Sequence, residues 1–245
     1  MYSLEYYVSL GCTNSCVGCS HGAPIRKGLI DVKVFETDVL KMAQVTLIQR
    51  FALSGGEPLL HPQIEELMEI ARFSGLSKEV MVLTNGVLLD KQPESFWEKL
   101  DVLRISRYPN QLKDEQIKRW KNHAHQYGAE FMCLDIDKFY KPLTRHVNSP
   151  EEIKKRFSKC PYFNKCAAIH NGMYYPCSQA SFFPELFSFK PNRDDCFPID
   201  HFFKERLNYF MLQTFPPASC SRCTYDLEIP WQQTTKENWV KDSTV

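Results

Sequence analysis

The sequence predicts an α/β protein in which short parallel strands alternate with amphipathic helices. Apolar runs of strand length recur along the first part of the chain. Between them lie stretches whose apolar residues are spaced three or four positions apart, as on one face of a helix. Gly75 and Gly128 follow two of these stretches, where a helix commonly ends. Together these observations indicate βα units around a parallel sheet.

Five apolar runs are expected to form the strands of this sheet, namely residues 6–10, 51–53, 80–83, 102–105 and 131–134. Three helical faces are expected between them, consisting of Phe35, Val39, Met42 and Thr46, then Ile64, Leu67, Met68 and Ala71, then Ile117, Trp120, Ala124 and Tyr127. The ordinary interpretation of such faces is core packing against the sheet.

The pattern changes after Lys141. Residues 146–150 are rich in Pro, Asn and Ser, which predicts a boundary between domains at 1–147 and 148–245. The second part is expected to hold a short helix at 151–157 and a hairpin that turns at Asn171 and Gly172. A further helix is expected, with Phe203, Leu207 and Phe210 on its apolar face.

Composition excludes several classes of protein. The chain has 245 residues, with 30 Lys and Arg against 29 Asp and Glu, so we expect no nucleic acid partner. The N-terminus lacks a basic targeting region, and no apolar run is long enough to span a membrane, which predicts a cytoplasmic protein. In a reducing compartment, ten cysteines indicate metal binding or catalysis rather than disulfides.

The first cysteine group follows the first expected strand. Cys12, Cys16 and Cys19 have the spacing C-x3-C-x2-C. Three thiolates on one loop can bind three irons of a [4Fe–4S] cluster and leave the fourth iron open to another ligand. A zinc site is the alternative, with His21 as its fourth ligand.

The segment Leu53-Ser-Gly-Gly-Glu-Pro58 follows the second expected strand, and with the three cysteines it resembles the radical S-adenosylmethionine (SAM) superfamily. In that family the amino and carboxylate groups of SAM chelate the open iron. The resemblance implies a partial (β/α) TIM-like barrel of about five to six parallel strands, followed by a small C-terminal α+β domain. It also implies SAM and a [4Fe–4S] cluster as cofactors.

The resemblance further implies a set of cofactor-binding residues, Gly55, Gly56, Glu57, Thr84, Asn85, Ser106 and Arg107. The two glycines are expected to let the backbone approach the ligand, and the Glu57 carboxylate to bind the SAM ammonium. Ser106 is expected near the ribose, and Arg107 near the SAM carboxylate. One position departs from the family pattern, because Gly18 stands where an aromatic residue often helps to hold the adenine.

The second cysteine group resembles the "twitch" domain, a short SPASM-like domain that carries an auxiliary cluster. The resemblance implies a second [4Fe–4S] cluster on Cys160, Cys177, Cys220 and Cys223. Cys166 could replace Cys160 as a ligand, and zinc on the same four thiolates is the alternative. The cysteines left over, Cys133, Cys166 and Cys196, are either buried apolar residues or donors of a hydrogen atom.

Further segments are similar to short radical SAM proteins of sugar-modifying pathways and to the 2-deoxy-scyllo-inosamine dehydrogenases. They are residues 18–21, 59–62 and 96–97, with Trp231 and Trp239 near the end of the chain. The resemblance implies that a 5′-deoxyadenosyl radical abstracts hydrogen from a small polar substrate and that a sugar or cyclitol alcohol is oxidised. His21, Arg104 and Arg107 are candidates to bind the hydroxyl group or accept its proton. A flavodoxin or ferredoxin is the expected electron donor.

Three alternatives stay open at this point. An epimerase would use one of the spare thiols to return a hydrogen atom to the substrate. A peptide-modifying enzyme would act on a ribosomally made precursor. A scaffold that binds zinc or an iron–sulfur cluster would carry out no reaction, but it would leave the Gly-Gly-Glu-Pro segment unexplained.

Overall fold

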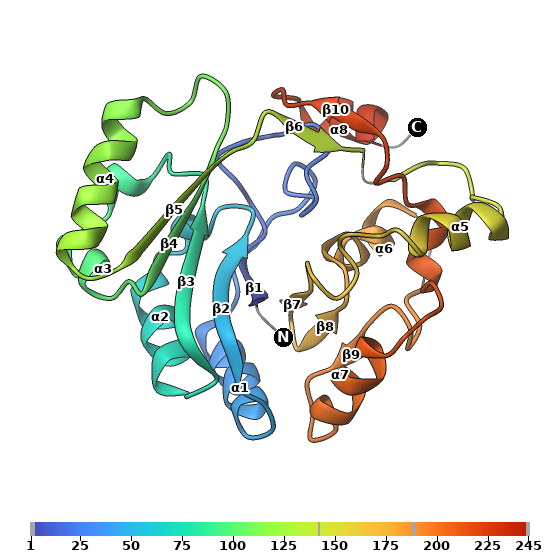
Figure 1. Cartoon of the computed structure of the whole chain (residues 1–245), viewed down its shortest axis with the longest axis horizontal. Helices are drawn as coiled ribbons and strands as arrows, with labels where there is room; N and C mark the ends of the chain where they lie inside the picture. Colours follow the sequence, from blue (N-terminus) through green and yellow to red (C-terminus); the bar gives the residue numbers. More distant parts are fainter. Residues whose placement is uncertain (1–2, 142, 188–189, 244–245) are drawn as a thin grey trace.

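The computed structural model describes residues 3–141, 143–187 and 190–243 (Figure 1). Its main sheet has eight strands in the order β5-β4-β3-β2-β1-β7-β8-β9. The strands of its first half are parallel, and they are β1 (Ser3–Ser9), β2 (Ile48–Gly55), β3 (Ser77–Thr84), β4 (Val102–Arg107) and β5 (Glu130–Asp135). All five expected strands are present, and the α/β fold class is confirmed.

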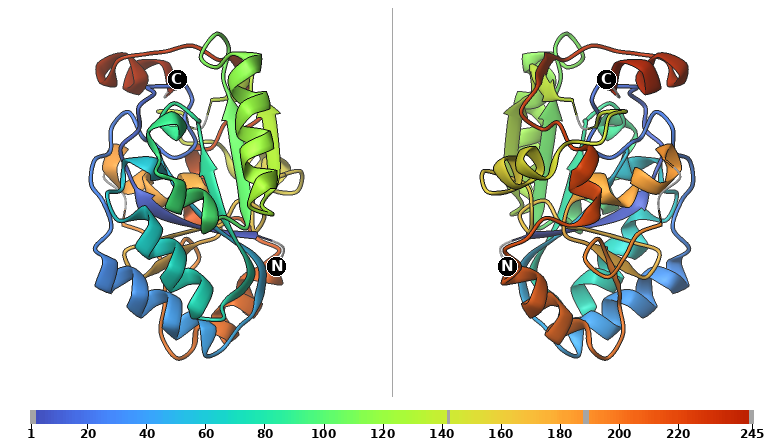
Figure 2. Two further views of the ribbon diagram at one scale, coloured as in Figure 1. Left: turned by 90° about the vertical axis from the view of Figure 1, so that its left-hand side faces the viewer. Right: turned by 90° about the vertical axis from the view of Figure 1, so that its right-hand side faces the viewer.

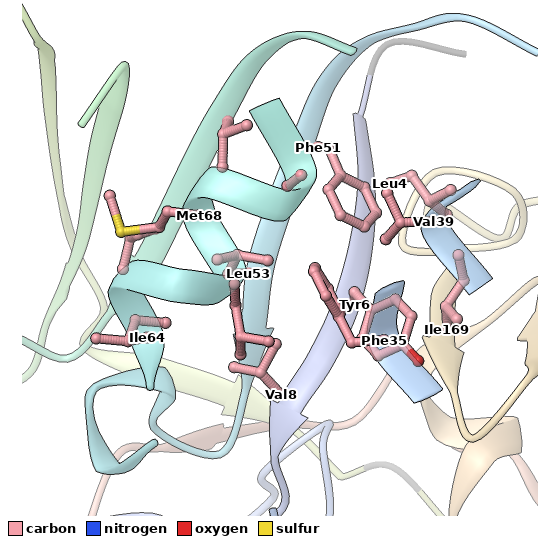
Figure 3. Close-up of a cluster of buried hydrophobic side chains, with 14 of the residues drawn as sticks. Leu4, Tyr6, Val8, Phe35, Val39, Phe51, Leu53, Ile64, Met68 and Ile169 are labelled. Atoms are coloured by element: carbon pink, nitrogen blue, oxygen red, sulfur yellow. The ribbon is translucent and has the colours of Figure 1, made fainter. Parts of the chain in front are cut away.

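The helices between these strands lie on one side of the sheet in Figure 1. They are α1 (Val32–Ala43), α2 (Ile64–Phe73), α3 (Glu94–Glu98) and α4 (Asp114–Gln126). The predicted faces pack as expected, although α1 ends before Thr46 and α4 before Tyr127. Figure 3 shows how Phe35 and Val39 of α1 and Met68 of α2 approach the apolar side chains of β1 and β2. This core fixes the positions of the strand ends.

The second part of the chain extends the same sheet. Its strands are β7 (Ala168–His170), β8 (Met173–Tyr175) and β9 (Phe197–Pro198), and β7 pairs in parallel with β1. The predicted hairpin is confirmed, because β7 and β8 are antiparallel and Asn171 and Gly172 both have positive φ. The division at residue 147 stays a prediction, and the sheet continues across it.

A buried carboxylate joins the two parts of the chain. Asp38 of α1 accepts hydrogen bonds from the Tyr6 hydroxyl at 2.7 Å and from the Gly172 backbone N–H at 2.9 Å. The turn of the β7–β8 hairpin is therefore held against the first helix of the barrel, and the second part takes a defined position relative to the strand ends.

The remaining elements are α5 (Pro150–Phe157), α6 (Phe183–Leu186), α7 (Phe203–Met211), α8 (Lys236–Ser243) and short 3₁₀ helices at Pro58–Leu60, Leu89–Lys91, Ser178–Ser181 and Ala218–Arg222. Ser149 caps α5 by accepting a hydrogen bond from the Glu152 N–H. Within the described ranges, no helix combines the length and the apolar character needed to cross a membrane.

A second, two-stranded sheet brings the end of the chain back to its beginning. It pairs β6 (Lys138–Tyr140) with β10 (Glu228–Pro230) in antiparallel fashion. Residues 231–234 then run beside the loop that follows β1, where Thr234 N–H donates to the Ser15 carbonyl and Val17 N–H to the Gln232 carbonyl. Both views of Figure 2 show these segments, red and blue, at the same end of the molecule.

Candidate active site

One cavity of about 410 Å³ lies at the carboxyl ends of the parallel strands. Most of the residues proposed for SAM and its cluster line this cavity together, namely Cys12, Cys16, Cys19, Gly55, Gly56, Thr84, Asn85 and Ser106. The carboxyl ends of parallel strands meet at one edge of a sheet, which is why segments up to about ninety residues apart share one cavity.

Donor groups surround the cysteine loop. The Cys12 sulfur accepts hydrogen bonds from the Asn14 backbone N–H and from Asn85 Nδ2, each at 3.4 Å. Asn85 Nδ2 also donates to Thr13 Oγ1 at 2.9 Å. Because Asn85 directly follows β3, it fixes the loop to the sheet.

The two glycines of the Gly-Gly-Glu-Pro segment lie against the backbone that leads into the cysteine loop. A Cβ on Gly55 would lie 2.1 Å from the Ser9 carbonyl oxygen, and one on Gly56 would lie 2.1 Å from the Gly11 oxygen. Gly56 N–H donates to the Ser9 carbonyl at 2.7 Å. The close approach that requires glycine is therefore made to the protein's own backbone, in addition to any contact with a ligand.

Glu57 takes a different place from the one that the sequence predicts. Its side chain is fully buried at 0% exposure and does not line the cavity. Its carboxylate accepts hydrogen bonds from Thr84 Oγ1 at 2.6 Å, Asn85 N at 2.9 Å and Leu59 N at 3.1 Å. Burial raises the pKa of Glu57 to about 7. In this structure Glu57 therefore ties the end of β2 to the end of β3, and its contact with the SAM ammonium stays a prediction.

Arg107 also lies outside the cavity. Its guanidinium pairs with Asp114 at 2.6 Å and lies 3.8 Å from Asp135. Side chains alternate along a strand, so Arg104 and Ser106 of β4 face the cavity while Arg107 does not. Arg104 is therefore the arginine available to an anionic group there, and its Nε is buried without a hydrogen-bond partner among the described residues.

The structure explains why position 18 is a glycine. Its φ is +72°, and a Cβ there would lie 2.8 Å from Ile229 Cδ1 and 2.9 Å from the Tyr140 carbonyl oxygen. The β6–β10 ribbon therefore packs where a side chain at this position would lie. Tyr108 and Phe139, whose rings stack with centroids 5.9 Å apart, line the cavity instead. They supply an aromatic surface that the sequence did not identify.

A buried acid–base pair lies beside Cys19. Glu5 Oε2 is 3.4 Å from His21 Nε2 and accepts a hydrogen bond from Ser54 Oγ at 3.0 Å. Burial opposes charge on each group, but their mutual contact keeps the pKa of Glu5 below its usual value and raises the pKa of His21 to about 10. Burial likewise disfavours a Cys19 thiolate, yet contact with His21 lowers its pKa. The arrangement favours a carboxylate, an imidazolium and a thiolate side by side.

A second, smaller cavity of about 30 Å³ is lined by Cys160, Cys177, Cys220 and Cys223. Apolar side chains, among them Leu143, Phe163 and Phe183, form much of its remaining wall. Burial raises the pKa of the Cys177 and Cys220 thiols, and that of Cys223 to about 11. Neighbouring cysteines add to the shift at Cys177 and Cys220, which indicates that the thiols lie close together.

The spare cysteines differ in their positions relative to the two cavities. Cys166 lines the large cavity, whereas Cys160 lines the small one. Cys133 on β5 and Cys196 before β9 line neither cavity. This placement favours Cys160 over Cys166 as a member of the four-cysteine group, and it leaves Cys166 as the spare thiol facing the large cavity.

Residues 6–127 match the sequence profile of the radical SAM superfamily. The chain contains a radical SAM domain. The matched range runs from β1 through α4 and includes the cysteine loop and the Gly-Gly-Glu-Pro segment.

Curated relatives with this domain are GTP 3′,8-cyclases. One from Chlorobaculum tepidum is 34% identical over 106 residues, which cover 41% of this chain and 32% of that protein. Another from Microcystis aeruginosa is 45% identical over 113 residues, which cover 42% of this chain and 34% of that protein. The chain therefore spans about a third of the length of these two relatives.

Solved structures share the fold over most of the chain. BtrN in complex with AdoMet and 2-DOIA has a TM-score of 0.55 at 13% identity and covers 87% of this chain and 88% of its own. The structure of anSMEcpe with bound AdoMet has a TM-score of 0.54 at 16% identity and covers 86% of this chain and 82% of its own. At these identities the likeness concerns the fold alone.

The residues present fit the cofactors of a radical SAM domain. The three loop cysteines line a cavity with ample room beside them, as an iron with an open position requires. The four other cysteines line one cavity together, and four thiolates are the ligand set of a fully ligated [4Fe–4S] cluster. Across the described part of the chain, no three His, Cys, Asp or Glu side chains converge as they would on a single metal ion. The fit therefore rests on which sulfurs line each cavity.

Proposed function

We propose that the chain is a radical SAM enzyme with two [4Fe–4S] clusters that oxidises an alcohol of a small polar substrate. The first cluster is assigned to Cys12, Cys16 and Cys19, and SAM to the cavity beside them. The second is assigned to Cys160, Cys177, Cys220 and Cys223. The proposed substrate class is a sugar or cyclitol, as the resemblance of the sequence to radical SAM proteins of sugar-modifying pathways implies.

The observation that carries this proposal is the shared wall between the two cavities. Tyr162 and Gln179 line both of them, so only one layer of side chains separates the large cavity from the four-cysteine site. Gln179 Oε1 lies 3.6 Å from the Cys223 sulfur. A substrate bound against Tyr162 or Gln179 would thus be separated from the four-cysteine site by that side chain.

SAM cleaved at a reduced [4Fe–4S] cluster supplies a 5′-deoxyadenosyl radical, the agent that takes a hydrogen atom from carbon. The protein's task is to bind, orient and keep water out. Phe139 and the edge of Tyr108 offer an aromatic surface for adenine, and Ser106 offers a hydroxyl for the ribose. Arg104, with its buried and unpaired Nε, suits either the SAM carboxylate or an oxygen of the substrate.

The oxidation balances with groups that the cavity holds. The alcohol carbon loses one hydrogen atom to the radical, its hydroxyl loses a proton, and one electron remains to be removed. Glu5 is the single carboxylate among the described residues lining the cavity, and contact with His21 favours its ionised form, which is the form able to accept a proton. It is therefore the proposed proton acceptor. Cys160, Cys177, Cys220 and Cys223 would hold a cluster able to accept this electron, and an external carrier would then take it up. A flavodoxin or ferredoxin is the proposed electron donor to the first cluster.

The test uses anaerobically reconstituted protein with SAM and a reductant. A panel of sugars, aminocyclitols and, because of the curated relatives, GTP would be assayed for 5′-deoxyadenosine and for a product two hydrogens lighter. Deuterium at the oxidised carbon should appear in 5′-deoxyadenosine. Transfer of deuterium without an oxidised product would contradict the dehydrogenase assignment.

A second candidate function is epimerisation, and the position of Cys166 favours it. A thiol in the large cavity could return a hydrogen atom to the substrate radical. Solvent deuterium would then enter the product, and Cys166→Ala would remove product formation while 5′-deoxyadenosine is still made. Cys133→Ala is the matched control, because Cys133 lines neither cavity. A Cys166→Ala variant with unchanged product would exclude this alternative.

A further inference from the structure

The segment after β10 contacts the middle of the cysteine loop, at residues 14–17. Ser15 N–H donates to Gln233 Oε1 at 2.9 Å, and Gln233 Nε2 donates to Asn14 Oδ1 at 3.3 Å. Together with the backbone bonds of Val17 and Thr234, these contacts place residues 231–234 beside residues 14–17. The residues in contact lie more than two hundred positions apart in sequence. Residues 231–234 thus contact the loop that is proposed to carry the first cluster.

Trp231 contacts the sulfur of a proposed cluster ligand. Its indole Nε1–H donates a hydrogen bond to the sulfur of Cys16 at 3.1 Å. The indole is held in place, because its ring stacks on Tyr108 with centroids 5.5 Å apart and planes 15° apart. Cys16 is itself buried, with 5% exposure, so water has little access to this sulfur.

We infer that Trp231 is a positioning residue that raises the reduction potential of the first cluster through this hydrogen bond. Donors to cluster sulfurs stabilise negative charge, and the reduced cluster carries one more negative charge than the oxidised one. A single donor in a water-poor site has a strong effect, since charge-assisted hydrogen bonds are stronger there. The inference rests on the proposed function, namely that Cys16 is a ligand of that cluster.

The test compares Trp231→Phe with wild type in the full reconstituted chain. Phenylalanine keeps an aromatic ring for the stack on Tyr108 and removes the N–H donor. Midpoint potentials would be measured by EPR-monitored redox titration of the signal that changes when SAM is added, which identifies the first cluster. We expect a more negative potential, by about tenfold in the equilibrium constant for reduction, or about 59 mV for one electron.

Two further variants make the result specific. Trp120→Phe removes another indole hydrogen bond, the 2.7 Å bond from Nε1 to Asp90, and should leave the potential unchanged. Replacing Trp231 by benzothienylalanine keeps the shape of the indole and removes only the N–H. It should reproduce the shift seen with Trp231→Phe.

The outcomes separate this inference from the proposed function. A wild-type chain without a SAM-sensitive cluster signal would overturn both. A wild type with two clusters whose Trp231 variants keep the wild-type potential would overturn the inference alone. So would a benzothienylalanine variant that fails to assemble the first cluster, since the N–H would then serve assembly and not the potential.

Discussion

The two cysteine sites differ in how the chain builds them. Cys12, Cys16 and Cys19 lie on one loop, and they open onto a cavity of about 410 Å³. The four cysteines of the second site come from three segments, since Cys220 and Cys223 share one, and they line a cavity of only about 30 Å³. A roomy site suits a cluster that binds a cofactor and faces a substrate, whereas a site with little space beside its cysteines suits a cluster that exchanges only electrons.

The two cysteine sites also differ in the side chains that surround and hold their cysteines. Polar contacts hold the first loop, with Asn85 and Trp231 donating to its sulfurs and Glu57 fixing the strand ends behind it. Apolar side chains, among them Leu143 and Phe183, line the second site. A polar site can tune and orient its ligands, while an apolar one excludes water. The predictions below test whether this difference corresponds to a difference in function.

The largest effect is expected from removing the first site. Replacing Cys12, Cys16 and Cys19 together by Ala should lower the iron content from about eight to about four per chain, because one of two cubanes is lost. Formation of 5′-deoxyadenosine should cease altogether. Iron analysis and chromatography of the SAM products measure the two results. A triple variant that still cleaves SAM would end the assignment of the first loop.

Loss of the second site should change the product without stopping SAM cleavage. Cys220→Ala should retain about four irons and still form 5′-deoxyadenosine, but little oxidised product, because the substrate radical lacks its electron acceptor. Cys196→Ala is the matched control, since Cys196 lines neither cavity. A structural metal site can contribute much of the folding energy of a small unit, so circular dichroism must show that the variant is folded. Oxidation at the wild-type rate by a folded one-cluster variant would refute the electron-acceptor role.

A smaller effect on the first site is expected from Gly56→Ala. The new Cβ would lie 2.1 Å from the Gly11 carbonyl oxygen, so the cysteine loop must shift. Overpacking of this kind typically costs about 1–3 kcal/mol in unfolding free energy. We expect weaker assembly of the first cluster and an unchanged second one. Gly11→Ala is the control, because a Cβ there meets nothing within 4 Å, and equal iron contents in the two variants would contradict the prediction.

Most of the architecture could be predicted from the sequence because it depends on local patterns. The spacing of apolar residues located the five parallel strands of the first half of the sheet, and Asn171-Gly172 located the hairpin. Most of the residues that the motifs predicted for SAM and its cluster line the large cavity. The residues of each pattern or motif lie close together in the sequence, so the pattern can be recognised without knowledge of the fold.

The contacts that individual side chains make were harder to predict from the sequence. Glu57 was expected at the SAM ammonium, but it accepts hydrogen bonds from the end of β3. Arg107 was expected in the cavity, but strand alternation directs it to Asp114. Trp231 contacts Cys16 only because the β6–β10 ribbon returns the chain to its beginning. Such contacts depend on tertiary packing across long stretches of sequence, which no spacing rule encodes.

The smallest predicted effect concerns Glu57 and pH. The folded-state pKa is raised from 4.5 to about 7 by burial, so the native state prefers the protonated acid. The stability that Glu57 contributes is therefore fully present below about pH 4.5 and is lost as pH rises through about 7. The shift corresponds to at most about 3 kcal/mol of unfolding free energy.

Glu57→Gln removes this titration and keeps the shape of the side chain. The unfolding free energy of wild type relative to Glu57→Gln should therefore fall between pH 5 and pH 8, by about 1–3 kcal/mol. Urea unfolding followed by circular dichroism at the two pH values measures it. Glu66→Gln serves as the control, because that residue is exposed on α2 and its change should show no such dependence. SAM affinity should stay close to wild type, since Glu57 does not line the cavity. A large loss of SAM affinity, with no pH-dependent difference in unfolding free energy, would show instead that Glu57 binds SAM. The role of Glu57 in joining the strand ends would then be wrong.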